Sequence, residues 1–398
     1  MRAFVCLLLF IAVASAELAR LEKVMEPIPG QYIVVLKDET NLDKFISSME
    51  LGAVAQGIQT EIRYKFGHVL NGFSLRIPDT FVEWLRGLDG VEYIEEAGVV
   101  RPQASQYNPP WGLDRINQEN LPLDYWYSYT YTGYGVNVYV IDSGIRYSHN
   151  DFGGRAYSFW DFQGGYGEDC NGHGTHCSGT IGGYTYGVAK NVILYNARVF
   201  PCSGSSSTDT IIAVSPTVFH YHYFISFYLI ITAMDYVGYY GLRPAVVSMS
   251  LGGGASNAQD LAVRNLYYAG FVVSVAAGND NANACYYSPA RAPEAITVGA
   301  TDSYDVRSTF SNYGSCLDLF APGTDITSAW YRSDSDSATI SGTSMACPHV
   351  SGACAKLLEY APGYTPADIA SVLIYNSAYN KLYNIGSGSP NILLYQSY

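Results

Sequence analysis

The feature that most constrains the fold is a series of short apolar runs in the second part of the chain. They read "VNVYVID", "VILYNARVF", "AVVSMSLGG", "FVVSVAAGN" and "AITVGA", and helical or glycine-rich segments separate them. Runs that are apolar on both faces and alternate with helices are typical of a parallel sheet covered on both sides. We therefore predict an α/β fold with helices on both faces of the sheet. Functional groups should gather where its strands end.

The N-terminal part of the chain predicts a separate, smaller α+β unit. Strand-like runs are "QYIVVLKD", "GFSLRIP" and "VEYIEEAGVV", and helical runs are "LDKFISSMELGA" and "TFVEWLRGL". The unit should end near Val100. The segment from Arg101 to Tyr107 loses periodicity and contains a proline, so we expect an exposed linker there. This gives one unit over residues 17–103 and a second over residues 104–398.

The first residues, "MRAFVCLLLFIAVASA", have one basic residue, an apolar core and small residues at the end. This pattern is typical of a secretory signal cleaved after Ala16, so residues 1–16 are expected to be removed and the protein to be extracellular. The net charge of −13 argues against nucleic acid or anionic membrane surfaces as partners. Export also favours disulfides. Cys6 leaves with the signal and seven cysteines remain, so at least one is unpaired within the chain.

Three motifs carry residues that suit nucleophilic catalysis. Asp142 ends the run "VYVID", His173 lies in "CNGHGTHCSGTIGG", and Ser344 lies in "SGTSMACPH" at a tight turn that opens a helix. Each has an ordinary explanation as a turn residue, a metal ligand or a helix cap. Together with Asn279 after "VSVAAG", however, they supply a nucleophile, a base, an orienting acid and an oxyanion donor. His176 follows His173 by three residues, but no third zinc ligand follows.

These blocks resemble the subtilisin-like serine proteases, specifically the proteinase K and aqualysin branch. The resemblance rests on "NGHGTHC", "SLGGG", "AAGNDNANAC", "STFSNYGSCLDLFAPG" and "GTSMACPH" and spans nearly all of residues 103–398. It implies that Asp142 orients His173, that His173 accepts the Ser344 proton, and that Asn279 binds the oxyanion. The same resemblance assigns substrate binding to six residues, Gly204, Ser250, Leu251, Gly252, Ala276 and Gly278. A roomy apolar pocket then implies broad specificity, with aromatic or aliphatic residues favoured before the scissile bond.

The resemblance also implies two disulfides and a structural calcium ion. The disulfides are Cys170 with Cys202 and Cys285 with Cys316. The calcium ligands are the Asp318 carboxylate and the carbonyl oxygens of Pro293 and Ala295, an all-oxygen set that suits this ion. Cys177, Cys347 and Cys354 remain. A contact between Cys177 and Cys347 is possible, but we favour three buried, reduced thiols.

The unit over residues 17–103 resembles the inhibitory propeptide of this family. We therefore expect a secreted serine endopeptidase, a monomer made as a zymogen, whose own propeptide blocks its cleft. The enzyme should cut itself between Arg101 and Tyr107. The partners are peptide and protein substrates, with no nucleic acid and no membrane. The alternative, from a different functional class, is a catalytically inactive secreted homologue.

The inactive alternative is considered because of an uncharged apolar run over residues 214–232, "VSPTVFHYHYFISFYLIIT". It interrupts a helix that is continuous in relatives, and its removal leaves the helical pattern "STDTIIAAMDYVGYYG". A membrane span would separate Asp142 and His173 from Asn279 and Ser344, so we exclude it. Two explanations stay open: a real aromatic loop, or an unspliced intron translated in error, which would make the chain an erroneous gene product. We favour the second, because an exposed apolar loop promotes aggregation.

Overall fold

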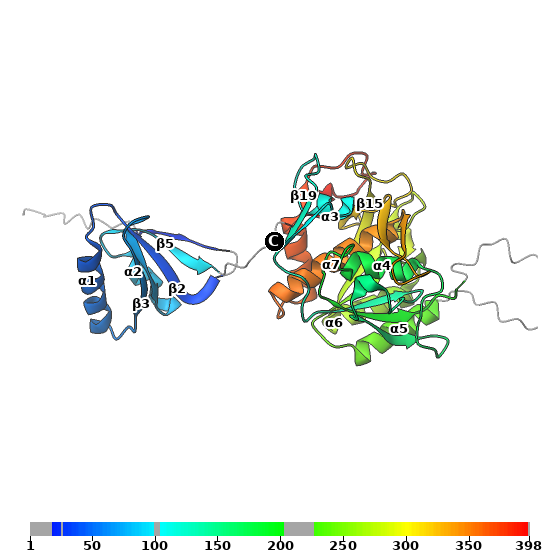
Figure 1. Ribbon diagram of the computed structural model, residues 1–398, viewed down its shortest axis with the longest axis horizontal. Helices are drawn as coiled ribbons and strands as arrows, with labels where there is room; N and C mark the ends of the chain where they lie inside the picture. Colours follow the sequence, from blue (N-terminus) through cyan, green and yellow to red (C-terminus); the bar gives the residue numbers. More distant parts are fainter. Residues whose placement is uncertain (1–17, 25–26, 99–103, 203–226, 397–398) are drawn as a thin grey trace, which may run out of the picture. The chain divides into compact units, whose positions relative to one another are not determined.

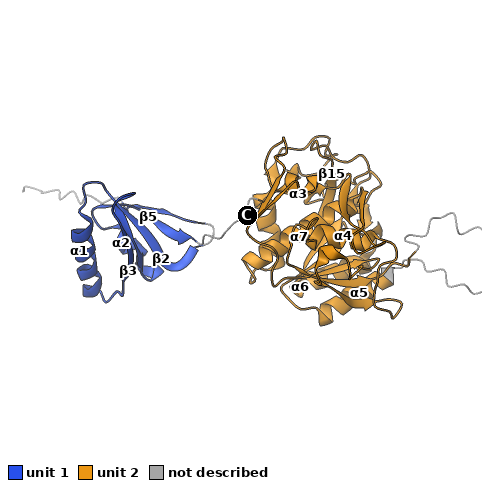
Figure 2. Cartoon of the chain, viewed as in Figure 1, with its two compact units in different colours: residues 1–102 blue, residues 103–398 orange. Residues whose placement is uncertain are grey.

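The structure is a computed structural model that describes residues 18–24, 27–98, 104–202 and 227–396 (Figure 1). The chain forms two compact units, Met1–Pro102 and Gln103–Tyr398 (Figure 2). The expected signal, Gly204 and most of the apolar run lie outside the described residues.

The first unit is a five-stranded sheet with two α-helices. The strand order is β1-β5-β2-β4-β3. The elements are β1 (Arg20–Glu22), β2 (Pro27–Leu36), α1 (Leu42–Ala55), β3 (Glu61–Phe66), β4 (Gly72–Arg76), α2 (Val82–Arg86) and β5 (Val91–Gly98). Val34 and Phe73 from the sheet form a core with Ile46 from α1. The sequence does not predict β3, because this edge strand is largely exposed and carries charged residues along its length.

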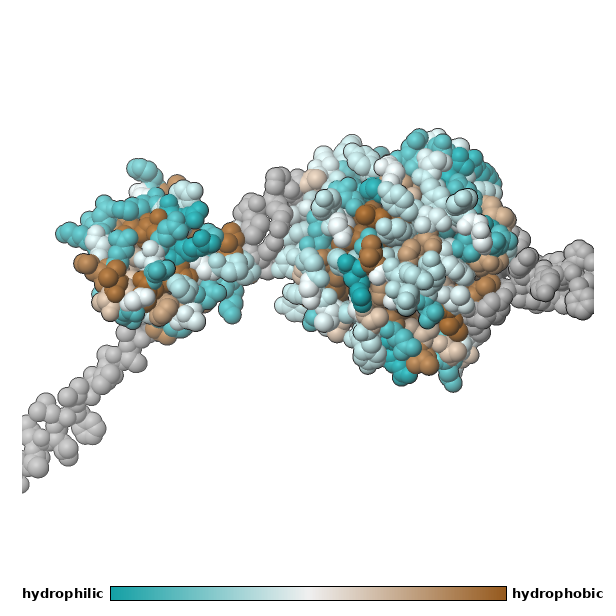
Figure 3. All heavy atoms as spheres, turned by 90° about the horizontal axis from the view of Figure 1, so that it is seen from below, coloured by the Kyte–Doolittle hydropathy of each residue, from teal (hydrophilic) through white to brown (hydrophobic). Residues whose placement is uncertain are grey.

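Apolar side chains also remain on the surface of this unit. Leu51, Val54 and Val69 are exposed, and Figure 3 shows hydrophobic residues among the hydrophilic ones on the unit's surface.

The second unit is built on a nine-stranded sheet that is parallel apart from the short β19–β20 pair. The strand order is β19-β20-β16-β15-β13-β11-β8-β10-β9. The strands are β8 (Asn137–Asp142), β9 (Ala156–Asp161), β10 (Ile193–Arg198), β11 (Ala245–Met249), β13 (Val272–Ala276), β15 (Ile296–Thr301), β16 (Leu319–Pro322), β19 (Ala378–Tyr379) and β20 (Ile392–Leu393). All five predicted runs therefore form strands of this sheet.

Helices cover both faces of this sheet, as predicted. The α-helices of the unit are α3 (Trp111–Ile116), α4 (His173–Gly182), α5 (Phe227–Tyr240), α6 (Asn257–Tyr268), α7 (Thr343–Tyr360) and α8 (Pro366–Asn376). Side chains alternate along β8, so Val138 and Val140 pack with α4, α7 and α8. Tyr139 and Ile141 pack on the other face with α5 and α6. Each helix pair, α4 with α7 and α5 with α6, is in direct contact (Figure 1).

The division between the two units, after Pro102, falls within the predicted boundary segment from Arg101 to Tyr107, but the last four residues of that segment are not a linker. Ala104–Tyr107 form the strand β6, which pairs with β7 (Trp126–Tyr129). Gln106 fixes the strand further, since its amide donates to the Thr185 carbonyl (3.0 Å) and accepts from the Lys190 ammonium (2.7 Å). A strand this short shows no detectable periodicity, and its partners are distant in the sequence.

The last residues of the apolar run belong to α5, which continues without interruption to Tyr240. Ile230 is buried on the α5 side of the sheet, next to Ala233 and Met234. In the part of the chain that the structure describes, no helix is both long and apolar enough to cross a membrane.

Candidate active site

The predicted catalytic residues come from the ends of three elements of the second unit. Asp142 is the last residue of β8, His173 begins α4, and Ser344 is the second residue of α7. The carboxyl ends of parallel strands meet at one edge of a sheet, and the helices start from that edge. The fold thus brings together residues that are far apart in the sequence.

Asp142 and His173 form a close, oriented pair. His173 Nδ1 lies 2.8 Å from Asp142 Oδ1 and 3.0 Å from Oδ2. Asp142 is fully buried, and the Ser143 N–H also donates to its Oδ1 (2.7 Å). Burial lowers the pKa of His173, but the charge and hydrogen bond of Asp142, together with the contribution of Cys177, outweigh burial and raise this pKa well above its usual value. With Nδ1 donating to the carboxylate, Nε2 is the nitrogen left to act as a base.

Ser344 is tied to its neighbours through both its backbone and its side chain. Its carbonyl accepts from Ser250 Oγ (2.8 Å) and from Cys177 Sγ (3.4 Å). The same Cys177 sulfur lies 3.9 Å from His173 Nδ1, so Ser344 and His173 share a neighbour. The Ser344 hydroxyl donates to the Ser250 carbonyl at 3.2 Å. None of the hydrogen bonds between described residues joins this hydroxyl to His173.

Asn279 presents its amide in a fixed orientation. Its Oδ1 accepts from the Thr343 N–H (2.8 Å) and the Thr343 hydroxyl (2.9 Å), which leaves Nδ2 as the outward donor. The Ser344 N–H, in the first turn of α7, has no partner within its own helix. Gly278, before Asn279, has φ +102°, and a Cβ there would lie 2.3 Å from Asn312 Nδ2. Only glycine fits this turn.

A cavity of about 280 Å³ lies beside Asn279 and Ser344. It brings together Leu251, Gly252, Ala276 and Gly278, which are the predicted substrate residues other than Gly204 and Ser250. Ser250 contacts Ser344 directly. The full lining is Leu251, Gly252, Gly253, Gly254, Ala276, Ala277, Gly278, Asn279, Asp280, Tyr287, Ala290, Thr343 and Ser344.

Both expected disulfides are present in the structure. Cys170 is bonded to Cys202, with Cα atoms 4.9 Å apart, and Cys285 to Cys316, with Cα atoms 5.4 Å apart. The three other cysteines of this unit, Cys177, Cys347 and Cys354, are free and buried. Burial raises the pKa of all three thiols, which disfavours the reactive thiolate.

The residues predicted to hold calcium lie near the surface. Pro293 and Asp318 are exposed and Ala295 is buried. Asp318 Oδ2 accepts from the Thr297 N–H (2.7 Å), and no lysine or arginine among the described residues forms an ion pair with it. Desolvation by the surrounding protein raises the pKa of this carboxyl to about 6. A carboxylate that solvent can reach, that the surrounding protein shields in part and that no cationic side chain of the described residues pairs with fits an oxygen-ligated cation.

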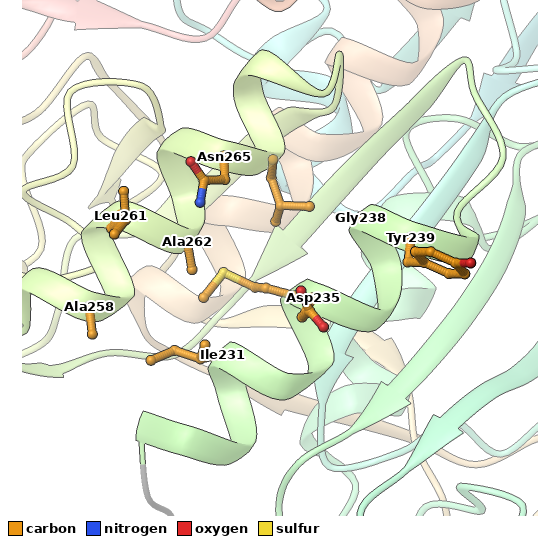
Figure 4. Close-up of a pocket in the computed structure, with 10 residues that line it drawn as sticks. Ile231, Asp235, Gly238, Tyr239, Ala258, Leu261, Ala262 and Asn265 are labelled. Carbon is orange, nitrogen blue, oxygen red and sulfur yellow. The ribbon is translucent and has the colours of Figure 1, made fainter.

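A second hollow lies between α5 and α6, and its volume is about 480 Å³ (Figure 4). Ile231, Met234 and Leu261 give it a largely apolar lining, to which Asp235 and Asn265 add polar groups. Its lining contains none of the predicted site residues and no paired nucleophile and base.

Two supporting residues were missed from the sequence. Thr343 fixes Asn279 through both its N–H and its hydroxyl. Asp169 accepts hydrogen bonds around the start of α4, four residues before His173. A carboxylate just before a helix start is a possible signal in the sequence, but such residues are common as simple caps.

Both units of the chain are similar to known proteins. The chain matches the family described as "Subtilase family" over residues 133–390 and "Peptidase inhibitor I9" over residues 31–103. An "Extracellular serine proteinase" of Thermus sp. (strain Rt41A) is 48% identical over 388 residues, or 93% of this chain and 90% of that protein. "Proteinase R" of Parengyodontium album is 40% identical over 373 residues, or 94% of this chain and 90% of that protein. The crystal structure of a cold adapted subtilisin-like serine proteinase has a TM-score of 0.66 at 47% identity, and the match covers 72% of this chain and 98% of that chain.

Proposed function

The chain belongs to the subtilase family, and from this premise we propose that it hydrolyses internal peptide bonds with Ser344 as the nucleophile. It is a subtilisin-like extracellular serine proteinase with a peptidase inhibitor I9 segment. The resemblance, the fold class and the enzyme class predicted from the sequence are therefore confirmed. The observation that carries the roles of individual residues is the 2.8 Å pair of His173 and Asp142, beside a fixed Asn279 amide.

The reaction begins with rotation of the Ser344 side chain away from the Ser250 carbonyl. Its proton passes to His173 Nε2 as its oxygen attacks the substrate carbonyl carbon. Asp142 stabilises the imidazolium that forms. The new oxyanion accepts from Asn279 Nδ2 and the Ser344 N–H. When the tetrahedral intermediate collapses, His173 gives the proton to the leaving amine, and water later releases the acyl group by the same steps.

The specificity follows from the 280 Å³ cavity beside Ser344. Glycine and alanine residues provide much of its lining, so there is room for a large side chain on the acyl side of the scissile bond. We infer broad specificity with a preference for aromatic and aliphatic residues, because they gain most from leaving water.

The inhibitor-type unit suggests that the protein is made as an inactive precursor that cuts itself. The predicted window for this cleavage is Arg101 to Tyr107, and the pairing of β6 from Ala104 onward favours its N-terminal part. We infer cleavage on the N-terminal side of Ala104. The released unit then remains as an inhibitor until it is degraded.

Calcium is the proposed structural cofactor. Asp318 and the carbonyl oxygens of Pro293 and Ala295 would hold it, and the ion would supply a positive charge to the Asp318 carboxylate. It has no part in the chemistry of Ser344.

The decisive experiment is casein hydrolysis and fluorophosphonate labelling of the matured protein. We expect labelling of Ser344, and Ser344→Ala should lose labelling and at least about 10³-fold in turnover. The variant should also keep its N-terminal unit attached. Ser351→Ala, in the same helix, is the control that should label normally. Activity that persists in Ser344→Ala would refute the proposal.

A further inference from the structure

One buried carboxylate connects the two elements that carry Asp142 and His173. Asp169 is 5% exposed and lies in the loop before α4. Its Oδ1 accepts from the Ser143 hydroxyl (3.1 Å) and from the N–H groups of Asn171 (2.9 Å) and Gly172 (2.9 Å). Its Oδ2 accepts from both the N–H (3.0 Å) and the hydroxyl (2.5 Å) of Thr175.

We propose that Asp169 is a positioning residue that fixes the orientation of His173 relative to Asp142. The inference rests on the proposed function of that pair. Asp169 lies outside the reacting groups and acts through Ser143 and the first turn of α4.

The connection to Asp142 passes through Ser143. The Ser143 N–H donates to Asp142 Oδ1, while its hydroxyl donates to Asp169 and accepts from the Gly174 N–H (2.9 Å). The residue after the catalytic carboxylate is thereby bonded to the residue after the catalytic histidine. Rotation of either element would break at least one of these bonds.

A second connection runs through Thr175. Its hydroxyl donates to Asp169 and accepts from the Arg146 N–H (3.0 Å), so the loop after β8 is held at two points. The Asp169 N–H also donates to the Ile145 carbonyl (3.4 Å). These bonds place the Asp169 backbone directly against the loop that follows Asp142.

This close approach requires glycine at position 144. Gly144 has φ +125°, and a Cβ there would lie 2.7 Å from the Asp169 Cα. The glycine of the "DSG" motif therefore has a physical reason, which is room for the Asp169 backbone.

The number of donors explains why a carboxylate is needed. Five N–H or O–H groups converge on two oxygens, and an ionised carboxylate offers only acceptors. Asparagine has the same size, but one oxygen becomes an NH₂ group that faces other donors. Negative charge at the start of α4 is also favourable for the helix dipole.

The test is Asp169→Asn, measured per active site by titration with a fluorophosphonate. We expect kcat to fall about 10–100-fold with KM within about twofold, because a misoriented base affects chemistry more than binding. The acid limb of the kcat/KM profile should move to lower pH. A looser contact with Asp142 weakens the largest of the effects that raise the pKa of His173, while the smaller contribution of Cys177 stays the same.

The matched control is Asp114→Asn. Asp114 is 1% exposed in α3, and among the described residues its carboxylate accepts only from the N–H groups of Asp124 and Tyr125. This variant can lose stability, but it should keep the wild-type kcat and acid limb. If Asp169→Asn does not fold, Ser143→Ala replaces it, with the same direction of change expected in kcat and in the acid limb.

Failure of the Asp169 proposal can be distinguished from failure of the proposed function. A titrated Asp169→Asn enzyme with wild-type kcat and an unmoved acid limb would overturn the inference, as would an equal loss in Asp114→Asn. For Ser143→Ala, unchanged kcat and acid limb would have the same meaning. If the wild-type protein itself fails to label, the proposed function is refuted, and this inference with it.

Discussion

The two faces of the large sheet use similar helices for different purposes. On one face, α4 and α7 begin at the active-site edge and carry His173 and Ser344. This face also buries polar groups, including His176 and the Lys356 ammonium. On the other face, α5 and α6 pack Met234, Val263 and their apolar neighbours against the same strands.

The difference shows where the sequence has little freedom. The active-site residues on the α4/α7 face are held by specific hydrogen bonds, so their positions depend on the identity of each partner. The α5/α6 face depends mainly on apolar burial, which tolerates replacement by another apolar sequence of similar size. The described residues of the anomalous run, 227–232, belong to α5 on this second face. We therefore expect perturbations to have large effects on the first face and small effects on the second.

The largest effect should come from Asn279→Ala at the active-site edge. Loss of the Asn279 amide should lower kcat about 10²–10³-fold, the loss known for removing this donor in a subtilisin. KM should change little, because the amide binds charge that develops in the transition state. The counterpart is Asn265→Ala in the α5/α6 hollow, for which we expect an unchanged kcat. Steady-state kinetics on a short peptide substrate would measure both, and equal effects would contradict the contrast between the faces.

The next prediction concerns the free energy of unfolding and the buried Lys356 side chain of α7. Lys356 is fully buried, and burial, with the nearby Lys190 charge, lowers its pKa to about 7. The unfolded chain has a lysine pKa of about 10.4, so it binds more protons than the folded chain between these values. The ionisation of Lys356 therefore makes the free energy of unfolding increase as pH rises from about 7 to about 10.4. Its destabilising effect is largest below pH 7.

Lys356→Met should remove that dependence. The free energy of unfolding of the variant should exceed that of the wild type most clearly at pH 7. The difference should shrink by about 2 kcal/mol by pH 9, since one proton contributes up to about 1.4 kcal/mol per pH unit. The variant also loses the hydrogen bond from Lys356 to Gln396 (3.0 Å), which lowers its free energy of unfolding by an amount that does not depend on pH. Chemical denaturation at several pH values would test this, with exposed Arg264→Met as the control. A difference independent of pH would refute the prediction.

These cases show what could be read from the sequence. The five strands and the helix starts follow from apolar runs and glycine-flanked turns, and those elements carry Asp142, His173 and Ser344 to one edge. The sequence does not reveal that Thr343 fixes Asn279 or that Asp169 bonds to Ser143, because these contacts depend on backbone positions set by the whole fold. Buried Lys356 was missed for a similar reason. A charged residue within a helix normally faces water.

A smaller effect is expected at the proposed calcium site, whose residues Ala295 and Asp318 directly precede β15 and β16. Calcium at ten times its Kd should stabilise the wild type by about 1.4 kcal/mol and so raise its Tm. Asp318→Asn should lose most of this response while keeping its kcat. Thermal unfolding of both proteins with added calcium, or with magnesium as the control, measures the change in Tm. A variant that calcium stabilises as well as the wild type would exclude Asp318 as a ligand.

The smallest effect should follow removal of residues 214–232 from the α5/α6 face. The run ends in "LIIT" before Ala233, and the residues before it, over 210–213, read "TIIA". Deletion therefore places Ile211 and Ile212 where Ile230 and Ile231 now stand, so the buried isoleucine of α5 is replaced by an isoleucine in the same register, while Thr210 replaces Leu229. We expect the shortened protein to label with fluorophosphonate and to have a kcat within about threefold of the full chain, since none of the described active-site contacts involves α5. Its solubility should rise, because a large uncharged apolar segment is gone. A deletion within α7 after Ser344 would instead remove residues that are almost all buried under the active-site edge, so the two faces differ in what they tolerate. If the shortened protein folds but does not label, the run contributes to the active site after all, and the division of labour between the faces is wrong.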